Sequence, residues 1–294
     1  MIGEIAALIT ALLWSGTSIV FTEASIRAGS FYVNVTRLII ANICLALTIL
    51  IFQVEINIST SQLFNLILSG FIGLVIGDTF LFKAFQYIGA RLSMLIMSLV
   101  PGMSALLAYI FLGEKISAIG IVGMLITISG ISMVVLNRSE KPSSSYKIGY
   151  SGIFYAVMGA LGQAIGLIFA KIAFNESDIN GFVAAFIRIS SSVLFIYPLF
   201  ILITRIKNPF SVFKNNKKAF TYTLIGSIIG PFFGITFSLI AVAHTKVGIA
   251  STLMSTVPII MLPMVKFYYK ENLSWIAILG AFLAVGGIVL LFMK

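Results

Sequence analysis

Asp78 is the one carboxylate that lies well inside an apolar stretch of this sequence (FIGLVIGDTFLF), and it is the strongest candidate for chemistry. An ionisable group at membrane depth is costly, so it usually faces a partner, an ion or a substrate. A carboxylate there can bind a cationic group or a coupling proton. It can also pair with a cation such as Arg37 or Lys83 and only stabilise the helix bundle. Both alternatives remain open at this point.

Amide and aromatic side chains accompany Asp78 at positions that favour a polar pocket. Gln86 lies eight residues after Asp78, on nearly the same face of a helix, and Phe82 lies between them. Gln163 lies in a later apolar stretch, and Trp14 lies in the middle of the first one. These residues predict hydrogen-bonding groups and apolar surfaces for a ligand. For Gln163, a hydrogen bond that only joins two helices is an equal alternative.

Pro101 and Pro258 lie at matching positions of two apolar stretches, and each follows a serine by three residues, Ser98 and Ser255 respectively. Proline removes a backbone donor and frees a carbonyl, so each is expected to interrupt its helix. Breaks at corresponding places in two halves of a membrane protein point to a central binding site. We therefore expect Pro101 and Pro258 to be flexible points that take part in gating.

Two arginines, Arg37 and Arg188, stand near the beginning of the second and seventh apolar stretches. Anchoring to lipid phosphates is the favoured interpretation, and a fixed charge at the mouth of a cavity is the other. Elsewhere no hydrolase elbow, phosphate loop or HExxH motif occurs, and the chain has one His and one Cys (Cys44). We expect no catalytic residues, no cofactor and no metal site.

The composition requires a membrane. Of 294 residues, 60% are hydrophobic and only 10% are charged, whereas a soluble domain has about 25% charged residues. The formal net charge is +10, but the Lys and Arg residues lie in loops between apolar stretches and form no single polar face that would bind nucleic acid. The lipid bilayer is therefore the expected partner, and no nucleic acid is expected.

Apolar stretches long enough to cross a bilayer predict an all-α membrane protein with ten transmembrane helices. The expected spans are 3–24, 33–53, 63–86, 91–112, 117–136, 149–173, 181–204, 219–243, 247–268 and 273–293. The polar, Ser- and Pro-containing segment 138–148 reads as a linker. It separates a first unit of five helices, residues 1–137, from a second one, residues 149–294.

The second unit repeats the first. A shift of 157 positions superposes Gly73 on Gly230, Gly77 on Gly234 and Pro101 on Pro258 without a gap. An odd number of spans in each unit makes the chain enter the second unit from the opposite side of the bilayer. Two inverted five-helix repeats related by an axis in the membrane plane are typical of secondary transporters.

Two segments of the chain resemble the EamA domain of the drug/metabolite transporter superfamily. They are AFQYIGARLSMLIMSLVPGMSALLAYIFLGEKIS and AVAHTKVGIASTLMSTVPIIMLPMVKFYYKENLS, and the opening LLWSGTSIVFTEA also matches. The resemblance implies two inverted five-helix repeats and a cavity lined by spans 1, 3, 4, 6, 8 and 9. Together with Gln86, the lining carried over from the family gives the expected substrate-binding set: Trp14, Asp78, Phe82, Gln86, Ser98, Gln163 and Ser255.

The expected function is that of a secondary active transporter in the cell membrane, which exports small amphipathic, amino-acid-like metabolites by alternating access. A multidrug or organic-cation exporter is one alternative, and a non-transporting membrane scaffold is another. A coupling proton is a further candidate partner, and the protein is expected to be a monomer or a homodimer. The basic loops place both chain ends outside the cell, whereas the resemblance implies cytoplasmic ends, so the orientation stays open.

Overall fold

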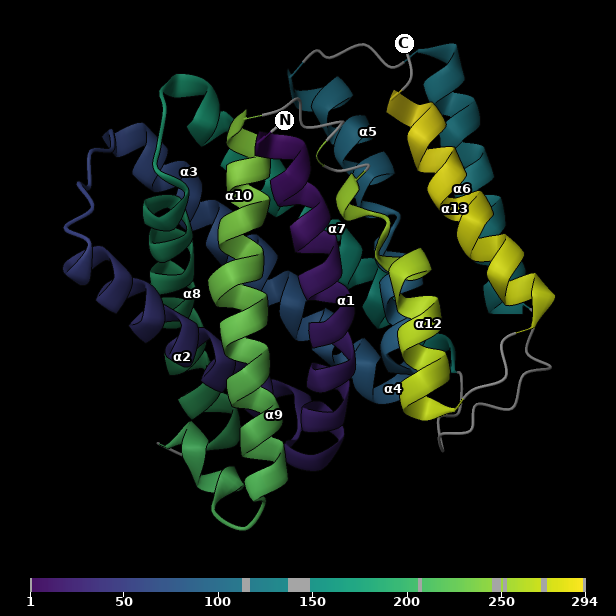
Figure 1. The fold of residues 1–294 in the computed structure, drawn as a ribbon. Coiled ribbons are helices and arrows are strands. Elements are labelled where there is room, and N and C mark those ends of the chain that lie inside the picture. The colour runs from purple at the N-terminus through teal and green to yellow at the C-terminus, as the bar shows by residue number, and fades with distance from the viewer. Residues whose placement is uncertain are drawn as a thin grey trace.

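Helices build both halves of the chain (Figure 1). The computed structural model describes residues 2–112, 117–136, 149–205, 208–244, 250, 253–270 and 274–292. Its first half contains α1 (Ile2–Ala28), α2 (Ser30–Ile51), α3 (Thr60–Gly70), the π-helix η1 (Phe71–Gly77), α4 (Asp78–Met97), α5 (Val100–Leu112) and α6 (Ala118–Leu136). The expected linker, 138–148, lies outside the described residues.

The second half follows the same order. It contains α7 (Tyr150–Glu176), α8 (Gly181–Thr204), the short 3-10 helix η2 (Pro209–Phe213), α9 (Lys217–Ser227), the π-helix η3 (Ile228–Gly234), α10 (Ile235–His244), α12 (Val257–Tyr269) and α13 (Trp275–Phe292). Within the described residues, six helical segments are long and apolar enough to cross a membrane: Ile2–Ala28, Ser30–Ile51, Thr60–Met97, Tyr150–Glu176, Gly181–Thr204 and Lys217–His244. The chain is thus an all-helical membrane protein.

Four further apolar helices in the described residues are shorter than the spans that the sequence predicts. Each of them ends either at a helix break or where the described residues end. The segment Thr60–Met97 runs on without a loop into the start of the predicted fourth span, but its backbone turns at Gly89, where φ is +75°. Glycine occupies this left-handed conformation without a Cβ clash. The boundary between the predicted third and fourth spans is therefore a single-residue turn.

A π-helix occupies the same register in each half. Shifting η1 by 157 residues gives the bounds of η3, and in each the residue after the π-helix donates its N–H to a carbonyl five residues earlier, Asp78 to Gly73 and Ile235 to Gly230. Short π-helical stretches inside α-helices are rare and occur often at functional sites. The backbone therefore shows the same duplication as the sequence. It does so in a pair of π-helices that the sequence pattern did not predict.

The predicted fourth and ninth spans are also broken at equivalent positions. Turns at residues 98–99 and 255–256 separate α4 from α5 and precede α12. The prolines themselves do not interrupt a helix, which corrects that expectation. Pro101 and Pro258 are each the second residue of the helix that follows the break. A backbone N–H in the first turn has no partner within the helix, so proline costs no hydrogen bond there. Ser98 and Ser255 lie in the breaks.

α6 and α13 pack against each other at one edge of the bundle, and their contacts reveal their relative direction (Figure 1). Thr127 Oγ1 donates to the carbonyl of Ala284, its own counterpart under the 157-residue shift, over 3.2 Å. A Cβ built on Gly130 would lie 2.6 Å from Gly280 O, and one on Gly287 would lie 2.5 Å from Gly123 O. Because early residues of each helix meet late residues of the other, the two helices are antiparallel.

Neighbouring glycines in α13 give a matched test of this packing. A Cβ at Gly287 would meet Thr127 Oγ1 and N at 2.4 and 2.5 Å, whereas one at Gly286 would meet nothing within 4 Å. We expect Gly287→Ala to lower the free energy of unfolding by about 1–3 kcal/mol, the typical cost of overpacking. Gly286→Ala should be neutral or slightly stabilising. Thermal unfolding in detergent measures both, and equal melting temperatures would contradict the antiparallel contact.

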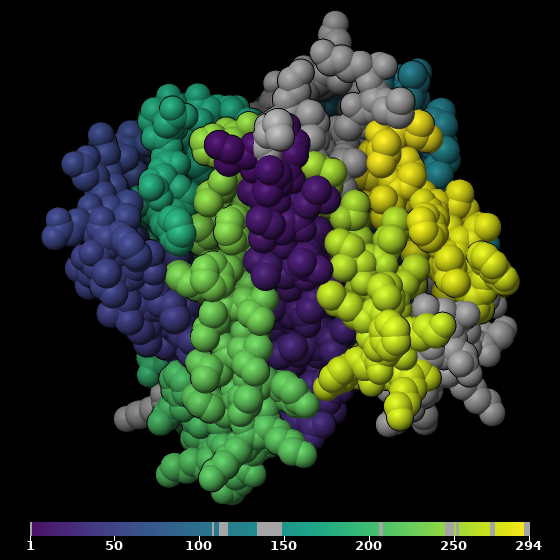
Figure 2. All heavy atoms as spheres, viewed as in Figure 1, coloured from purple at the N-terminus to yellow at the C-terminus, as the bar shows by residue number. Residues whose placement is uncertain are grey.

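The first helix of each half packs against the third span of the other half. α1 contacts α9, η3 and α10, and α7 contacts α3, η1 and α4. Figure 2 shows α1, in purple, seated between α9–α10 and α12. This exchange of partners brings residues of α1, η1, α7 and η3 around one central space.

Local interactions hold the α3–α7 contact in place. The Ser59 hydroxyl accepts from the Gln62 N–H and the Gln62 side chain accepts from the Ser59 N–H, each over 3.0 Å, which forms a capping box at the start of α3. The same Gln62 amide donates to the carbonyls of Ala173 and Ser177, at 3.1 and 3.0 Å. The start of α3 is thereby joined to the end of α7.

Candidate functional site

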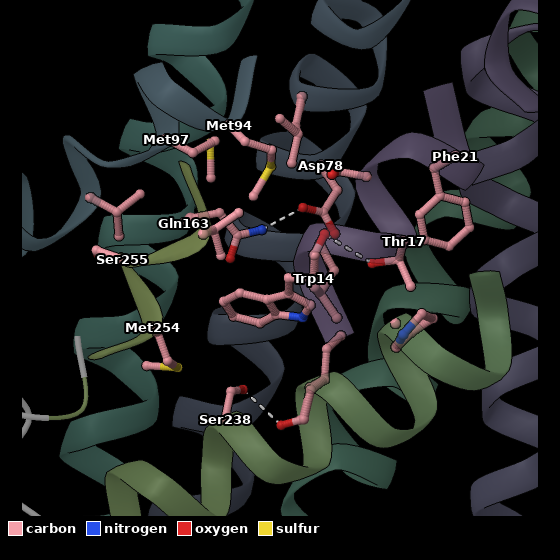
Figure 3. A pocket seen from close by; sticks show the side chains of 18 of the residues that line it. Trp14, Thr17, Phe21, Asp78, Met94, Met97, Gln163, Ser238, Met254 and Ser255 are labelled. Atoms are coloured by element: carbon pink, nitrogen blue, oxygen red, sulfur yellow. Dashed lines mark hydrogen bonds between the residues drawn. The ribbon is translucent and has the colours of Figure 1, made fainter. Parts of the chain in front are cut away.

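A cavity of about 170 Å³ lies in the middle of the bundle, with walls from both halves (Figure 3). Most of the residues predicted from the sequence line it: Trp14, Asp78, Phe82, Ser98, Pro101, Gln163, Ser255 and Pro258. The π-helices contribute directly, because Leu74, Gly230 and Pro231 belong to the same wall. The two helix breaks and the two π-helices therefore meet at one place.

Asp78 forms an ion pair with Arg37, whose guanidinium Nη2 donates to the carboxylate Oδ2. Both residues are buried, with 5% and 4% of their surface exposed. Such a pair is costly to break, because the remaining charge is left without a partner in a low-dielectric environment. Of the two alternatives that the sequence left open for Asp78, the structure contains the pairing with Arg37.

Further contacts hold the Arg37 guanidinium. Its Nε donates to Asn34 Oδ1 over 2.9 Å, and its Cζ lies 4.5 Å from the centre of the Phe82 ring and 5.6 Å from that of Phe21. A guanidinium over an aromatic face gains a cation–π attraction. The favoured interpretation of Arg37 as a lipid-phosphate anchor is wrong, because the side chain points into the protein and is fully engaged there.

Gln163 connects α7 to the end of η1. Its amide Nε2 donates to Asp78 Oδ1 and, over 3.0 Å, to the Gly73 carbonyl. This approach depends on glycine pairs between the helices: a Cβ on Gly162 would lie 2.6 Å from Gly77 Cα, and one on Gly166 would lie 3.0 Å from Gly73 Cα. Gln163 therefore both lines the cavity and bonds between helices, so its two predicted roles coincide.

Arg188 also lines the cavity, but its guanidinium has no ion-pair partner in the part of the chain that the structure describes. The residue is 5% exposed, and its Nε is buried without a hydrogen-bond partner among those residues. A Cβ on Gly73 would lie only 2.8 Å from Nη2, so the absence of a side chain there admits the guanidinium. Its burial also contradicts lipid anchoring. Among the described residues, the lining thus carries two positive charges and one negative charge.

Gln86 does not belong to the cavity wall. Its amide Nε2 donates to the carbonyl of Ser25 over 2.6 Å and so joins α4 to the end of α1. Eight residues correspond to slightly more than two turns of an α-helix, so its side chain is rotated away from that of Asp78. The structure thus brings together all the predicted substrate-binding residues except this one.

Apart from Trp14, the residues of α1 that line the cavity were not predicted from the sequence. Thr17, Ser18 and Phe21 line the cavity beside Trp14 (Figure 3 labels Thr17 and Phe21). Their spacing from Trp14, by three, four and seven residues, is that of one helix face, and this signal was available. Met94, Met97 and Met254 add flexible apolar side chains that adapt to varied ligands.

The comparisons with known proteins decide the family. The model of the EamA-like transporter family matches residues 1–136 and again residues 150–293. The chain belongs to the EamA-like transporter family. It is therefore a membrane transporter of the drug/metabolite type, and the two matches coincide with the two halves that share π-helices and helix breaks.

Comparison with solved structures adds the fold of this EamA-like transporter. The fold is similar to that of a solved structure titled "Crystal structure of protein". The TM-score is 0.69 and the sequence identity is 15%, over 98% of this chain and 97% of the other. At that identity the likeness concerns the fold alone. No curated protein matches the chain at a significant level.

Proposed function

We propose that this EamA-like transporter is a ten-helix secondary transporter that exports small amphipathic, amino-acid-like metabolites across the cell membrane by alternating access. The observation that carries the proposal is the central cavity, whose walls come from equivalent elements of both repeats. Apolar groups such as Trp14 and Met254 and polar groups such as Gln163 and Arg188 face the same space. Such a lining suits a small molecule that has one polar and one apolar end.

The antiparallel packing of α6 and α13 supports the inverted arrangement of the repeats. A two-fold axis that superposes one antiparallel helix on the other is perpendicular to both helices. Because these helices cross the membrane in the proposed ten-helix arrangement, that axis lies in the membrane plane. Inverted repeats of this kind allow outward-open and inward-open states of similar energy. The breaks at Ser98 and Ser255 supply bending points in each repeat, and energy would come from an ion gradient or from exchange.

The alternatives fit less well. An organic-cation exporter needs a free carboxylate in its cavity, whereas Asp78 is already paired with Arg37. Proton coupling through Asp78 would have to break the same pair. A non-transporting scaffold has no use for a cavity between its repeats whose wall carries a buried arginine, Arg188, that forms no ion pair within the described part of the chain.

Blocking the cavity tests the proposal. Ser255→Trp puts a large side chain into the cavity, and we expect uptake of amino acids into proteoliposomes to fall at least about tenfold, while the protein still inserts and folds. Ser129→Trp is the matched control, because Ser129 is exposed on the outside of α6. The panel contains amino acids and organic cations, with and without a pH gradient. Undiminished uptake by Ser255→Trp would place the transport path elsewhere.

A further inference from the structure

Arg37 and Arg188 are equivalent residues with unequal surroundings. Gly29 is the N-cap of α2 and Asn180 is the N-cap of α8, and each arginine follows its N-cap by eight residues. Both are buried and both line the cavity. Arg37 has a carboxylate, an amide oxygen and two aromatic faces as partners, whereas the Arg188 guanidinium has none of these among the described residues.

The duplication explains the difference. Asp78 directly follows η1, and the residue that directly follows η3 is Ile235. Ile235 is buried and lines the same cavity, so an isoleucine stands where the repeat would place the counter-ion of Arg188. The ion pair of the first repeat is thus absent from the described residues of the second. A buried cation without a partner is expensive unless something else supplies the negative charge.

The chemistry of the missing partner follows from the guanidinium. Arginine presents a planar set of N–H donors that binds a carboxylate through two parallel hydrogen bonds. The described residues of the lining have an excess of one positive charge, which a single carboxylate neutralises. Leu239 and Met254 line the same space and offer apolar surface to the rest of the ligand.

We propose that Arg188 binds the carboxylate of the transported molecule, so that the substrates are small amphipathic acids or zwitterions rather than amines. As a statement about transport this rests on the proposed function, but the binding event is separable from it. Ile235 contributes to the same binding site, because its apolar side chain leaves the guanidinium of Arg188 available to the ligand.

Trp14 provides a binding signal that does not depend on transport. It lines the cavity, and the other tryptophan, Trp275, is 80% exposed on the outside and is removed as Trp275→Phe. In detergent, leucine, 4-methylpentanoate and 3-methylbutylamine are titrated against Trp14 fluorescence. We expect the two carboxylates to change the fluorescence and the amine not to. Arg188→Gln should weaken carboxylate binding at least about tenfold, and Arg188→Lys should weaken it less.

A second pair of variants leaves Arg188 in place. Ile235→Asp supplies the internal counter-ion that the first repeat has, and we expect it to abolish carboxylate binding. Ile235→Asn has nearly the same shape without the charge and should retain carboxylate binding. Equal loss in both variants, or equal binding of the amine and the acids to the unaltered protein, would overturn the role of Arg188.

Transport of the same compounds into proteoliposomes separates the two proposals. Carboxylate binding that depends on Arg188, with no uptake of any compound, supports the role of Arg188 and contradicts the transport proposal. Uptake that is unaffected by Arg188→Gln supports transport and contradicts carboxylate binding by Arg188.

Discussion

Asp78→Asn should lower the free energy of unfolding by about 3–5 kcal/mol, the cost of leaving one member of a buried ion pair unpaired. The variant keeps the shape of the side chain but leaves the guanidinium of the buried residue Arg37 without its ion-pair partner. Transport should fall with it, because the same carboxylate accepts from Gln163 at the cavity wall. Unfolding in detergent, followed by circular dichroism, measures the change in stability.

The double variant Arg37→Gln/Asp78→Asn tests whether the loss comes from the pair. It should be less destabilised than the sum of the two single variants, by a coupling of about 0.5–3 kcal/mol. The matched control is Glu23→Gln, because Glu23 forms the more exposed pair with Arg27 over 3.0 Å within α1. Such a pair contributes only about 0.3–0.5 kcal/mol. Additive losses, or an effect of Glu23→Gln as large as that of Asp78→Asn, would refute the buried pair.

Gly162→Ala should destabilise the protein by about 1–3 kcal/mol and reduce transport more than stability alone accounts for. A Cβ there would lie 2.6 Å from Gly77 Cα, 3.0 Å from Gly77 N and 3.2 Å from the carbonyl of Ile72. These are backbone atoms, so no side chain can rotate away and α7 must move from η1. That movement would stretch the hydrogen bonds of the neighbouring Gln163 to Asp78 and Gly73.

Gly16→Ala is the control for this variant, because it lies within α1 and a Cβ there would meet nothing within 4 Å. It should leave stability unchanged or raise it slightly, since alanine reduces the freedom of the unfolded chain. Melting curves in detergent and uptake into proteoliposomes are compared for the two variants. If Gly162→Ala matched Gly16→Ala in both, close contact between α7 and η1 would not matter for the site.

Much of the site could be predicted from the residues, because polar groups inside apolar stretches are few and the repeat marks equivalent positions. Asp78, Gln163, Ser98 and Ser255 were found in this way, and all four line the cavity. The positions of the helix breaks were nearly right, although the turns precede Pro101 and Pro258 instead of coinciding with them. Gln86 was misplaced because eight residues are slightly more than two helical turns, and its side chain donates to the carbonyl of Ser25 in α1 instead of lining the cavity.

The amino-acid sequence by itself determined the class of the protein: a helical membrane protein built from two similar halves. Composition and a constant spacing of residues suffice for that, because they reflect the solvent and the duplication rather than particular contacts. Only the tertiary structure decided which arginine has a counter-ion. Arg37 and Asp78 are 41 residues apart and Asp78 and Gln163 are 85 apart, and such contacts depend on how separate helices pack. The π-helices that place Asp78 and Ile235 on the wall are also seen only in the structure, because the pattern of apolar residues does not distinguish a π-helix from an α-helix.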